Sequence, residues 1–241
     1  MPFISRILQH KSLAVVGLEK NCGKTECLNY ILGRIPSDQY KVCITSIGID
    51  GESIDQVTRT KKPEIHLKEG SYFSTSEGHY RLRNLTAEIV GISNETTALG
   101  RIISARVVSP GNVILSGPSS TSSLRRWMRE TEDFGIDLTI IDGALSRMSS
   151  ASPAVSSSLI LATGAALSSN ISTLVSKTAF TVEMIHLPMY DGSISDTDAL
   201  AVELSSLSGE YNIPQGCRRV YISGALTDRL LKRLLQEKSV G

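Results

Sequence analysis

The sequence predicts an α/β fold, in which a mostly parallel sheet forms the middle of three layers and a β-rich segment is inserted between its α/β units. The first observation is a series of short apolar runs, most of them followed by a helical pattern, at residues 13–17, 41–48, 112–118, 136–143, 158–163 and 219–225. The second is a stretch of short β-type runs separated by turn residues, at about 61–110. Alternating strands and helices are typical of parallel sheets.

Length and charge limit the classes of protein to consider. The 241 residues fit one large domain, so we expect a single domain over 1–241 with the β-rich insertion at about 61–110. The formal net charge of +1 lacks the excess of basic residues typical of nucleic-acid binders, and no nucleic-acid partner is expected. Residues 1–11 lack a signal-peptide pattern and no apolar run is long enough to span a bilayer, which predicts a cytoplasmic location without membrane association.

The first third of the chain predicts a strand–helix–strand unit. Residues 3–8 fit a short amphipathic helix, and an apolar strand follows at 13–17. A helical stripe at 26–35 ends at Pro36, and residues 41–48 predict the second strand. This spacing predicts that the two strands form a parallel pair with a right-handed crossover.

The turn after the first strand contains a phosphate-binding pattern. The chain there reads GLEKNCGKT, an apolar strand leading into a polar turn that ends in Gly23, Lys24 and Thr25. The N–H groups of such a turn and of the following helix form a cradle for phosphate, with the lysine on the terminal phosphates and the threonine hydroxyl on Mg²⁺. Gly17 stands one residue earlier than the usual pattern requires. A strand–turn–helix that reads Gly-Lys-Thr by chance is the alternative, and its context favours phosphate binding.

The residues of this turn and of the first helical turn are therefore the candidates for nucleotide contact. They are Gly17, Glu19, Lys20, Asn21, Cys22, Gly23, Lys24, Thr25 and Glu26. Before nucleotide binds, Lys24 is expected to face solvent. The chain has no Asn-Lys-x-Asp element of the kind that reads guanine, so ATP with Mg²⁺ is the expected ligand.

Two acidic residues follow predicted strands and are candidates for metal binding and catalysis. Asp142 ends an apolar strand, where a carboxylate can hold Mg²⁺ or its bound water opposite Thr25. Asp50 follows the second strand at the edge where ligands collect in parallel sheets. Both precede glycine, so a simple turn is the alternative, with equal weight at Asp50. The expected catalytic residues are Lys24, Asp50 and Asp142, and the expected metal ligands are Thr25, Asp50 and Asp142.

The later elements continue the alternation. Residues 80–83 and 112–118 are expected in strands, 119–133 and 171–184 in helices, and 199–207 and 228–237 in two further helices. The loop at 162–165 follows a strand, where it could flank the nucleotide base or a partner. Tight packing explains its glycine equally well.

Taken together, these motifs predict a three-layer P-loop NTPase fold, and they carry a resemblance to known families. The spacing of Gly17 and Gly23 and the strand end at Asp142 are similar to those of dethiobiotin synthetases and the SIMIBI group of P-loop proteins. Over nearly the whole chain, the sequence resembles the P-loop subunit of the reactivase of lysine 5,6-aminomutase, an adenosylcobalamin enzyme. The segments that carry this resemblance are residues 16–25, 45–52, 60–63, 141–147 and 223–228.

The resemblance implies a Mg²⁺-dependent ATPase that acts as a reactivating chaperone. Such a protein would exchange damaged cobalamin out of its enzyme, and its partner would be a cobalamin-dependent aminomutase or a second reactivase subunit. A homo-oligomer is compatible with this function. The alternatives are a metabolic ligase or kinase of the dethiobiotin synthetase type, and a protein that binds nucleotide without hydrolysing it.

Overall fold

The fully buried strand β1 (Ser12–Gly17) lies between β7 and β8 in an eight-stranded sheet of the computed structural model. The structure describes residues 2–48, 65–144, 156–187, 201–204, 219–222, 231–232 and 234–235. The other strands of this sheet are β2 (Val42–Ser46), β3 (Ile65–Leu67), β4 (Tyr72–Ser76), β5 (Asn84–Thr97), β6 (Gly100–Val113), β7 (Leu138–Ala144) and β8 (Ser158–Ala162).

Strands β4, β2, β7, β1 and β8 lie side by side and run parallel. Strand β6 runs antiparallel to its neighbours β3, β4 and β5, and β5 forms a long hairpin with it. The prediction of an α/β fold with a mostly parallel sheet is confirmed. β1 and β2 are parallel, but they are not the adjacent pair expected from their order in the chain, because β7 lies between them.

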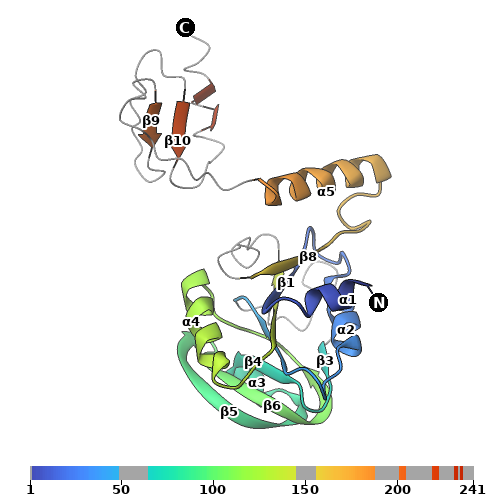
Figure 1. The fold of residues 1–241 in the computed structure, drawn as a ribbon, viewed down its shortest axis with the longest axis vertical. Helices are drawn as coiled ribbons and strands as arrows, with labels where there is room; N and C mark the ends of the chain where they lie inside the picture. Colours follow the sequence, from blue (N-terminus) through green and yellow to red (C-terminus); the bar gives the residue numbers. More distant parts are fainter. Residues whose placement is uncertain are drawn as a thin grey trace. The chain divides into compact units, whose positions relative to one another are not determined.

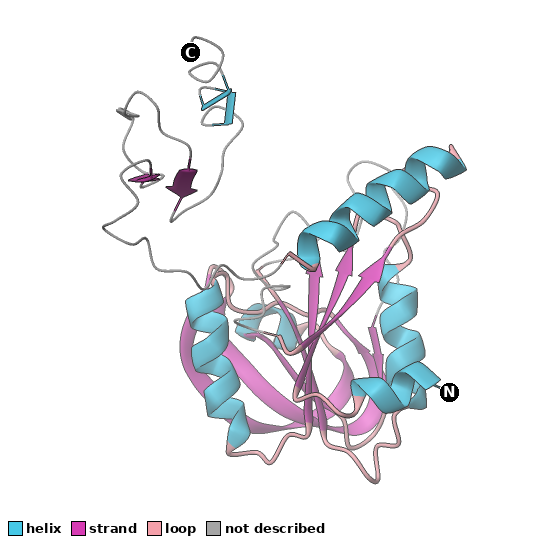
Figure 2. Ribbon diagram, turned by 45° about the horizontal axis from the view of Figure 1, so that its top comes forward, coloured by secondary structure: helices cyan, strands magenta, loops and turns pink. Residues whose placement is uncertain are grey.

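Helices cover both faces of the parallel part of the sheet (Figures 1 and 2). Helices α1 (Pro2–Ile7) and α2 (Lys24–Arg34) lie on one face, and α4 (Thr121–Glu132) lies on the other. On the α2 face, Leu28 and Ile31 pack into a cluster with Val15, Ile44 and Ile140. On the α4 face, the buried core is formed by Cys43, Ile47, Ile102, Leu124, Trp127 and Ile141. These two apolar layers hold the carboxyl ends of β1, β7 and β2 together.

Two short elements differ from the sequence prediction. Residues 80–83 were expected in a strand, but α3 (Glu77–Arg81) is a helix that begins at Ser76, whose Oγ accepts a hydrogen bond from the backbone N–H of His79 at 3.5 Å. Residues 199–207 were expected in a helix, but β9 (Ala201–Leu204) is a strand. An N-cap and strand pairing outweigh the local pattern at these two places. A strand was also expected over residues 112–118. In the structure, the first two of these residues are the end of β6, which ends at Val113.

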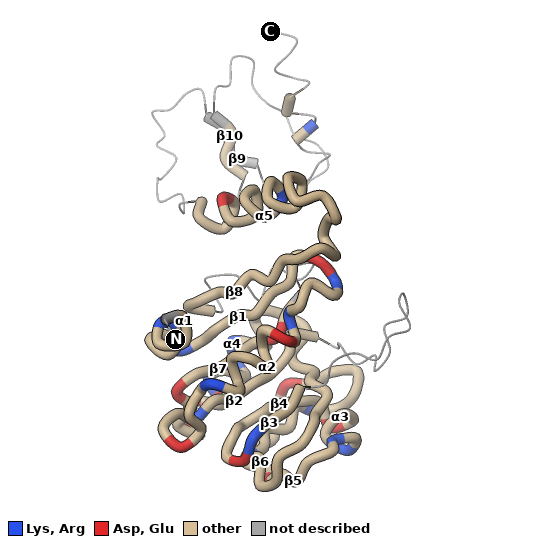
Figure 3. The backbone as a smooth tube through the Cα atoms, turned by 90° about the vertical axis from the view of Figure 1, so that its right-hand side faces the viewer, with Lys and Arg blue, Asp and Glu red and all other residues tan. Residues whose placement is uncertain are grey.

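Residues 1–185 and 186–241 form two separate units. The first ends with α5 (Ile171–Ile185), and the second contains β9 and β10 (Arg219–Ile222), which pair in parallel. A single domain over 1–241 stays a prediction. Among the described residues, no helix combines the length and the apolar character needed to cross a membrane. Figure 3 shows Lys and Arg interspersed with Asp and Glu along the described chain.

Candidate functional site

Residues 18–23, here called the phosphate loop, connect the end of β1 to the start of α2. The backbone N–H of Leu18 donates to the carbonyl of Ala162 at the end of β8, at a distance of 2.9 Å. A Cβ atom built on Gly164 would lie 3.6 Å from the Cys22 carbonyl oxygen, so the chain after β8 packs closely against this loop. The residues at the end of β8 thus support the phosphate loop. They belong to the loop at 162–165, which we expected to flank the nucleotide base or a partner.

Gly17 and Cys22 are in tight contact at the base of the phosphate loop. A Cβ atom built on Gly17 would lie 2.6 Å from the Sγ atom of Cys22 and 3.2 Å from the carbonyl oxygen of Glu19. Real Cβ atoms almost never approach other atoms as closely as the first distance. The glycine that departs from the usual motif spacing therefore makes room for the buried Cys22 thiol.

The backbone of the phosphate loop turns so that α2 begins without a side-chain cap. Asn21 has φ of 59° and Gly23, the N-cap residue, has φ of 86°. In α2, which is described throughout, no side chain caps the N-terminus. Its first N–H groups and the positive end of its dipole therefore face the loop, an arrangement that favours an anion. The loop N–H of Lys20 already donates to a carboxylate oxygen of Glu19 at 2.9 Å.

Lys24 and Asp142 form an ion pair across the site. The Nζ atom of Lys24 lies 2.9 Å from Oδ1 of Asp142, and their side chains are 18% and 11% exposed. Asp142 is held at this position by β7, where it is in register with Val15 of β1 and Ser46 of β2. The expectation that Lys24 faces solvent is wrong, because the nearby carboxylate attracts the ammonium group into a partly buried contact.

The other predicted site residues lie around this pair or outside the described structure. Thr25 follows Lys24 in the first turn of α2 and is half-buried, while Glu26 is exposed. Glu19, Lys20 and Asn21 are also exposed on the loop. Asp50 belongs to residues 49–64, which lie outside the described residues.

The donor set at this edge of the sheet fits a hard divalent cation. The Asp142 carboxylate and the Thr25 hydroxyl are oxygen ligands of the kind that Mg²⁺ prefers, and Mg²⁺ commonly takes one or two protein ligands together with phosphate oxygens and water. Within the described part of the chain, no group of three or more His, Cys, Asp or Glu residues could hold a metal ion by itself. A Mg²⁺ ion here would take its other ligands from water or from phosphate oxygens.

A second group of buried polar side chains lies beside β4, at the start of α3. The Oγ atom of Ser116 donates to Oγ of Ser76 at 2.7 Å and accepts the Ser76 backbone N–H at 3.0 Å. It also lies 2.9 Å from Nδ1 of His79. The hydroxyl of Thr75 donates to the Ile114 carbonyl and accepts the Ser116 N–H. We call Thr75, Ser76, His79 and Ser116 the Ser116 network.

The bonds of the Ser116 network fix its protonation pattern. With the Ser116 hydroxyl donating to Ser76, the tautomer that satisfies both groups has a proton on Nδ1 of His79, which then donates to Oγ of Ser116. Burial lowers the pKa of His79, which keeps the imidazole neutral. In the neighbouring core, burial raises the pKa of the Cys43 thiol to about 12. Neither group resembles an activated catalytic residue.

Sequence reasoning missed Ser46, which occupies the last position of β2 beside Asp142. The residue is 1% exposed, and its Oγ atom has no hydrogen-bond partner in the described part of the chain. Its place at the carboxyl end of a parallel strand was a readable signal, because ligands bind at this edge of the sheet. The missing partner could be learned only from the structure.

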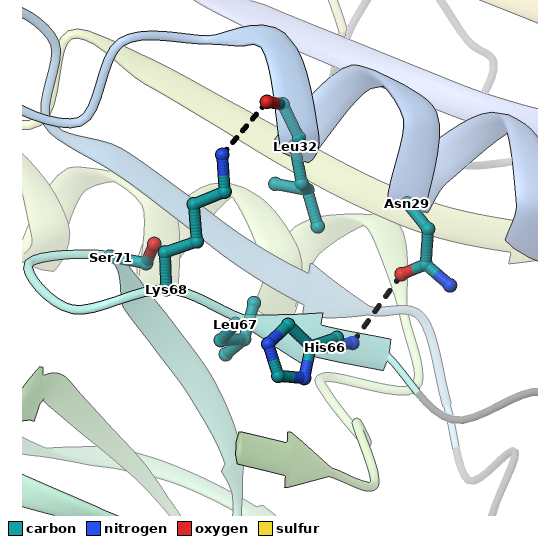
Figure 4. A pocket seen from close by; sticks show the side chains of 7 residues that line it. Asn29, Leu32, His66, Leu67, Lys68 and Ser71 are labelled. Atoms are coloured by element: carbon teal, nitrogen blue, oxygen red, sulfur yellow. Dashed lines mark hydrogen bonds between the residues drawn. The ribbon is translucent and has the colours of Figure 1, made fainter. Parts of the chain in front are cut away.

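A separate pocket lies between α2 and β3 (Figure 4). It has a volume of about 260 Å³ and is lined by Asn29, Leu32, Gly33, His66, Leu67, Lys68 and Ser71. The ammonium group of Lys68 is engaged with the Gly33 carbonyl at 2.8 Å. None of the predicted site residues lines this pocket.

Comparison with models of known protein families, with curated proteins and with solved structures finds no match to this chain.

Proposed function

We propose that this protein has a P-loop NTPase fold and binds ATP with Mg²⁺ at the phosphate loop. The observation that carries the proposal is the 2.9 Å ion pair between Lys24 and Asp142. It joins the Gly-Lys-Thr sequence at the start of a helix to the acidic residue at the end of the neighbouring strand. A strand–turn–helix that read Gly-Lys-Thr by chance would have no reason to face such an acid.

In this proposal, each group has a separate role in holding the nucleotide. The loop amides and the uncapped N-terminus of α2 bind phosphate oxygens, and Lys24 neutralises the charge of the terminal phosphates. Thr25 and Asp142 hold Mg²⁺, which supplies further neutralisation of charge on the phosphates. Lys24 must exchange its contact with Asp142 for phosphate when nucleotide binds.

The proposal is tested by titrating the full chain with Mg²⁺ and a nonhydrolysable ATP analogue in a calorimeter. We expect Lys24→Ala to weaken binding at least about 100-fold, because a charge-assisted contact to phosphate is lost in a partly buried site. Lys11→Ala is the matched control, since Lys11 precedes β1 at the opposite end of the same strand. Equal affinities for wild type and Lys24→Ala would refute the proposal.

We further propose that hydrolysis of ATP drives a reactivating chaperone for an adenosylcobalamin-dependent aminomutase. This step rests on the sequence resemblance rather than on the geometry of the site. A pull-down of the aminomutase with and without the ATP analogue, followed by rescue of the inactivated enzyme, tests it. Turnover that needs a small substrate and no protein partner would instead indicate a dethiobiotin synthetase-like ligase or kinase. Tight binding without turnover would indicate a non-hydrolysing nucleotide-binding protein.

A further inference from the structure

The hydroxyl of Ser46 is buried without a hydrogen-bond partner. Ser46 is 1% exposed, and no atom of the described residues forms a hydrogen bond with its Oγ. Buried hydroxyl groups are normally hydrogen-bonded, because removing them from water without compensation destabilises the fold. A serine kept at such a position calls for an explanation beyond packing.

The surroundings of Ser46 differ from those of the other buried groups without a partner. Among the described residues, these include Nε1 of Trp127, which is enclosed by the apolar cluster between α4 and the sheet. Ser46 instead ends β2, at the edge of the sheet where the phosphate loop and Lys24 are found. Oδ1 of Asp142 is another such atom among the described residues, but that oxygen is in the ion pair with Lys24, whereas the Ser46 hydroxyl lies beside the candidate site with neither kind of contact.

Strand register places Ser46 and Asp142 on the same face of the sheet. Ser46 pairs with Asp142 in the parallel ladder between β2 and β7, and residues paired in this way point to the same side. Two residues earlier in these strands, Ile44 and Ile140 pack in the cluster that contains Leu28 of α2. Ser46 and Asp142 thus lie on the face that α2 covers, and Lys24 of α2 reaches this face to contact Asp142.

The order of the strands separates Ser46 from the phosphate loop by one strand. β1 carries the loop, β7 carries Asp142, and β2 carries Ser46 on the far side of β7. A phosphate chain held by the loop and by Lys24 would extend along this edge toward β7 and β2. In this arrangement the phosphate farthest from the nucleoside would lie nearest to Ser46, and local movement would have to expose the buried Oγ atom for the two to touch.

We propose that the Ser46 hydroxyl donates a hydrogen bond to the terminal phosphate of a bound nucleoside triphosphate and so distinguishes it from a diphosphate. This inference rests on the proposed function, because it requires nucleotide at the phosphate loop. It adds a positioning residue to which the sequence motifs assign no role. Among the described residues the hydroxyl has no partner, and the third phosphate would supply one.

The test compares the affinities of Ser46→Ala and wild type for a nonhydrolysable ATP analogue and for ADP, each with Mg²⁺. We expect Ser46→Ala to weaken binding of the ATP analogue about 10-fold or more, as for loss of a hydrogen bond to a charged group, and to change ADP binding less than about 2-fold. The thermal midpoint of the ligand-free protein should stay equal or rise, because a hydroxyl without a partner is removed.

Thr45→Val is the matched control. Thr45 precedes Ser46, points to the opposite face, and donates its hydroxyl to the Ser74 carbonyl at 3.2 Å. We expect this variant to lower the thermal midpoint and to leave the ratio of the ATP-analogue and ADP affinities unchanged. Ser46→Ala should therefore change the ratio of nucleotide affinities without lowering the thermal midpoint, and Thr45→Val should do the reverse.

The outcomes separate this inference from the proposed function. An unchanged ratio of affinities in Ser46→Ala, or an equal loss for both nucleotides, overturns the role assigned to Ser46. If Lys24→Ala has lost nucleotide binding in the same experiment, the proposed nucleotide site is supported although the role of Ser46 is refuted. If Lys24→Ala binds both nucleotides like wild type, the phosphate site itself is refuted.

Discussion

Strand β2 has two kinds of buried polar neighbours, one on each flank. On the β4 flank, the Ser116 network satisfies its members with several internal hydrogen bonds. On the β7 flank, Ser46 has no partner and stands beside the Lys24–Asp142 ion pair. The comparison teaches that burial alone does not identify a ligand site. A buried network in which every polar group is hydrogen-bonded stabilises the fold, whereas a buried polar group without a partner can form a hydrogen bond with a ligand.

The largest effect on stability is expected from Ser116→Ala. The substitution leaves the Ser76 N–H and Nδ1 of His79 without their partner, and each buried unsatisfied group costs about 1–3 kcal/mol, so we expect the free energy of unfolding to fall by roughly 3 kcal/mol. Urea unfolding of the ligand-free chain measures the change. Ser46→Ala is the comparison, with no expected loss. If Ser116→Ala and Ser46→Ala lowered the free energy of unfolding equally, the contrast between the two flanks of β2 would be refuted.

A smaller loss is expected from Lys24→Ala in the absence of nucleotide. The substitution leaves the largely buried Asp142 carboxylate without its cation, which should lower the free energy of unfolding by about 1–3 kcal/mol. The double variant Lys24→Ala/Asp142→Asn removes the uncompensated charge, so it should recover part of the stability while still failing to bind nucleotide. A double variant with the full sum of both losses would show that the pair is not coupled.

The smallest effect is a dependence of stability on pH that arises from the Ser116 network. Burial lowers the pKa of His79, so below about pH 6.5 the unfolded chain binds a proton that the folded chain does not. Stability from this group is therefore complete above about pH 6.5 and is lost as the pH falls, by at most about 1.4 kcal/mol per pH unit.

The contribution of His79 is measured as the difference between wild type and His79→Asn in the slope of unfolding free energy against pH. We expect a steeper slope for wild type between about pH 5 and 6.5, because only wild type carries the buried imidazole. Ser46→Ala should keep the wild-type slope. Identical slopes for wild type and His79→Asn would contradict the assignment of a buried neutral histidine.

Much of the parallel sheet could be predicted, because each strand and the helix after it have a residue pattern within their own segment of the sequence. β1, α2, β2 and β7 follow from apolar runs and helical stripes, and the position of Asp142 near the phosphate loop follows from the rule that the carboxyl ends of parallel strands meet. The ion pair of Asp142 with Lys24 was not predicted, because Lys24 was expected to face solvent. The order of the strands could not be read in this way. The insertion of β7 between β1 and β2 depends on contacts between segments that are far apart in the sequence.

The errors of prediction have two physical origins. Short elements such as α3 and β9 are too short for a pattern to decide between helix and strand, so a cap or a pairing strand decides. The second origin is that sequence shows which groups are polar but not which of them are satisfied. Ser46 and Ser116 are both buried serines, and which of them has hydrogen-bond partners can be seen only in the structure.

The contact between Gly17 and Cys22 has an evolutionary consequence. A side chain at position 17 would occupy the space of the Cys22 sulfur atom, so the two positions cannot vary independently. The Cβ atom of an alanine at position 17 would lie 2.6 Å from this sulfur and 3.2 Å from the Glu19 carbonyl oxygen, so both the Cys22 side chain and the loop backbone would have to shift. Related chains should therefore show covariation between these positions, and a search pattern that treats them as separate sites would overlook this form of the loop.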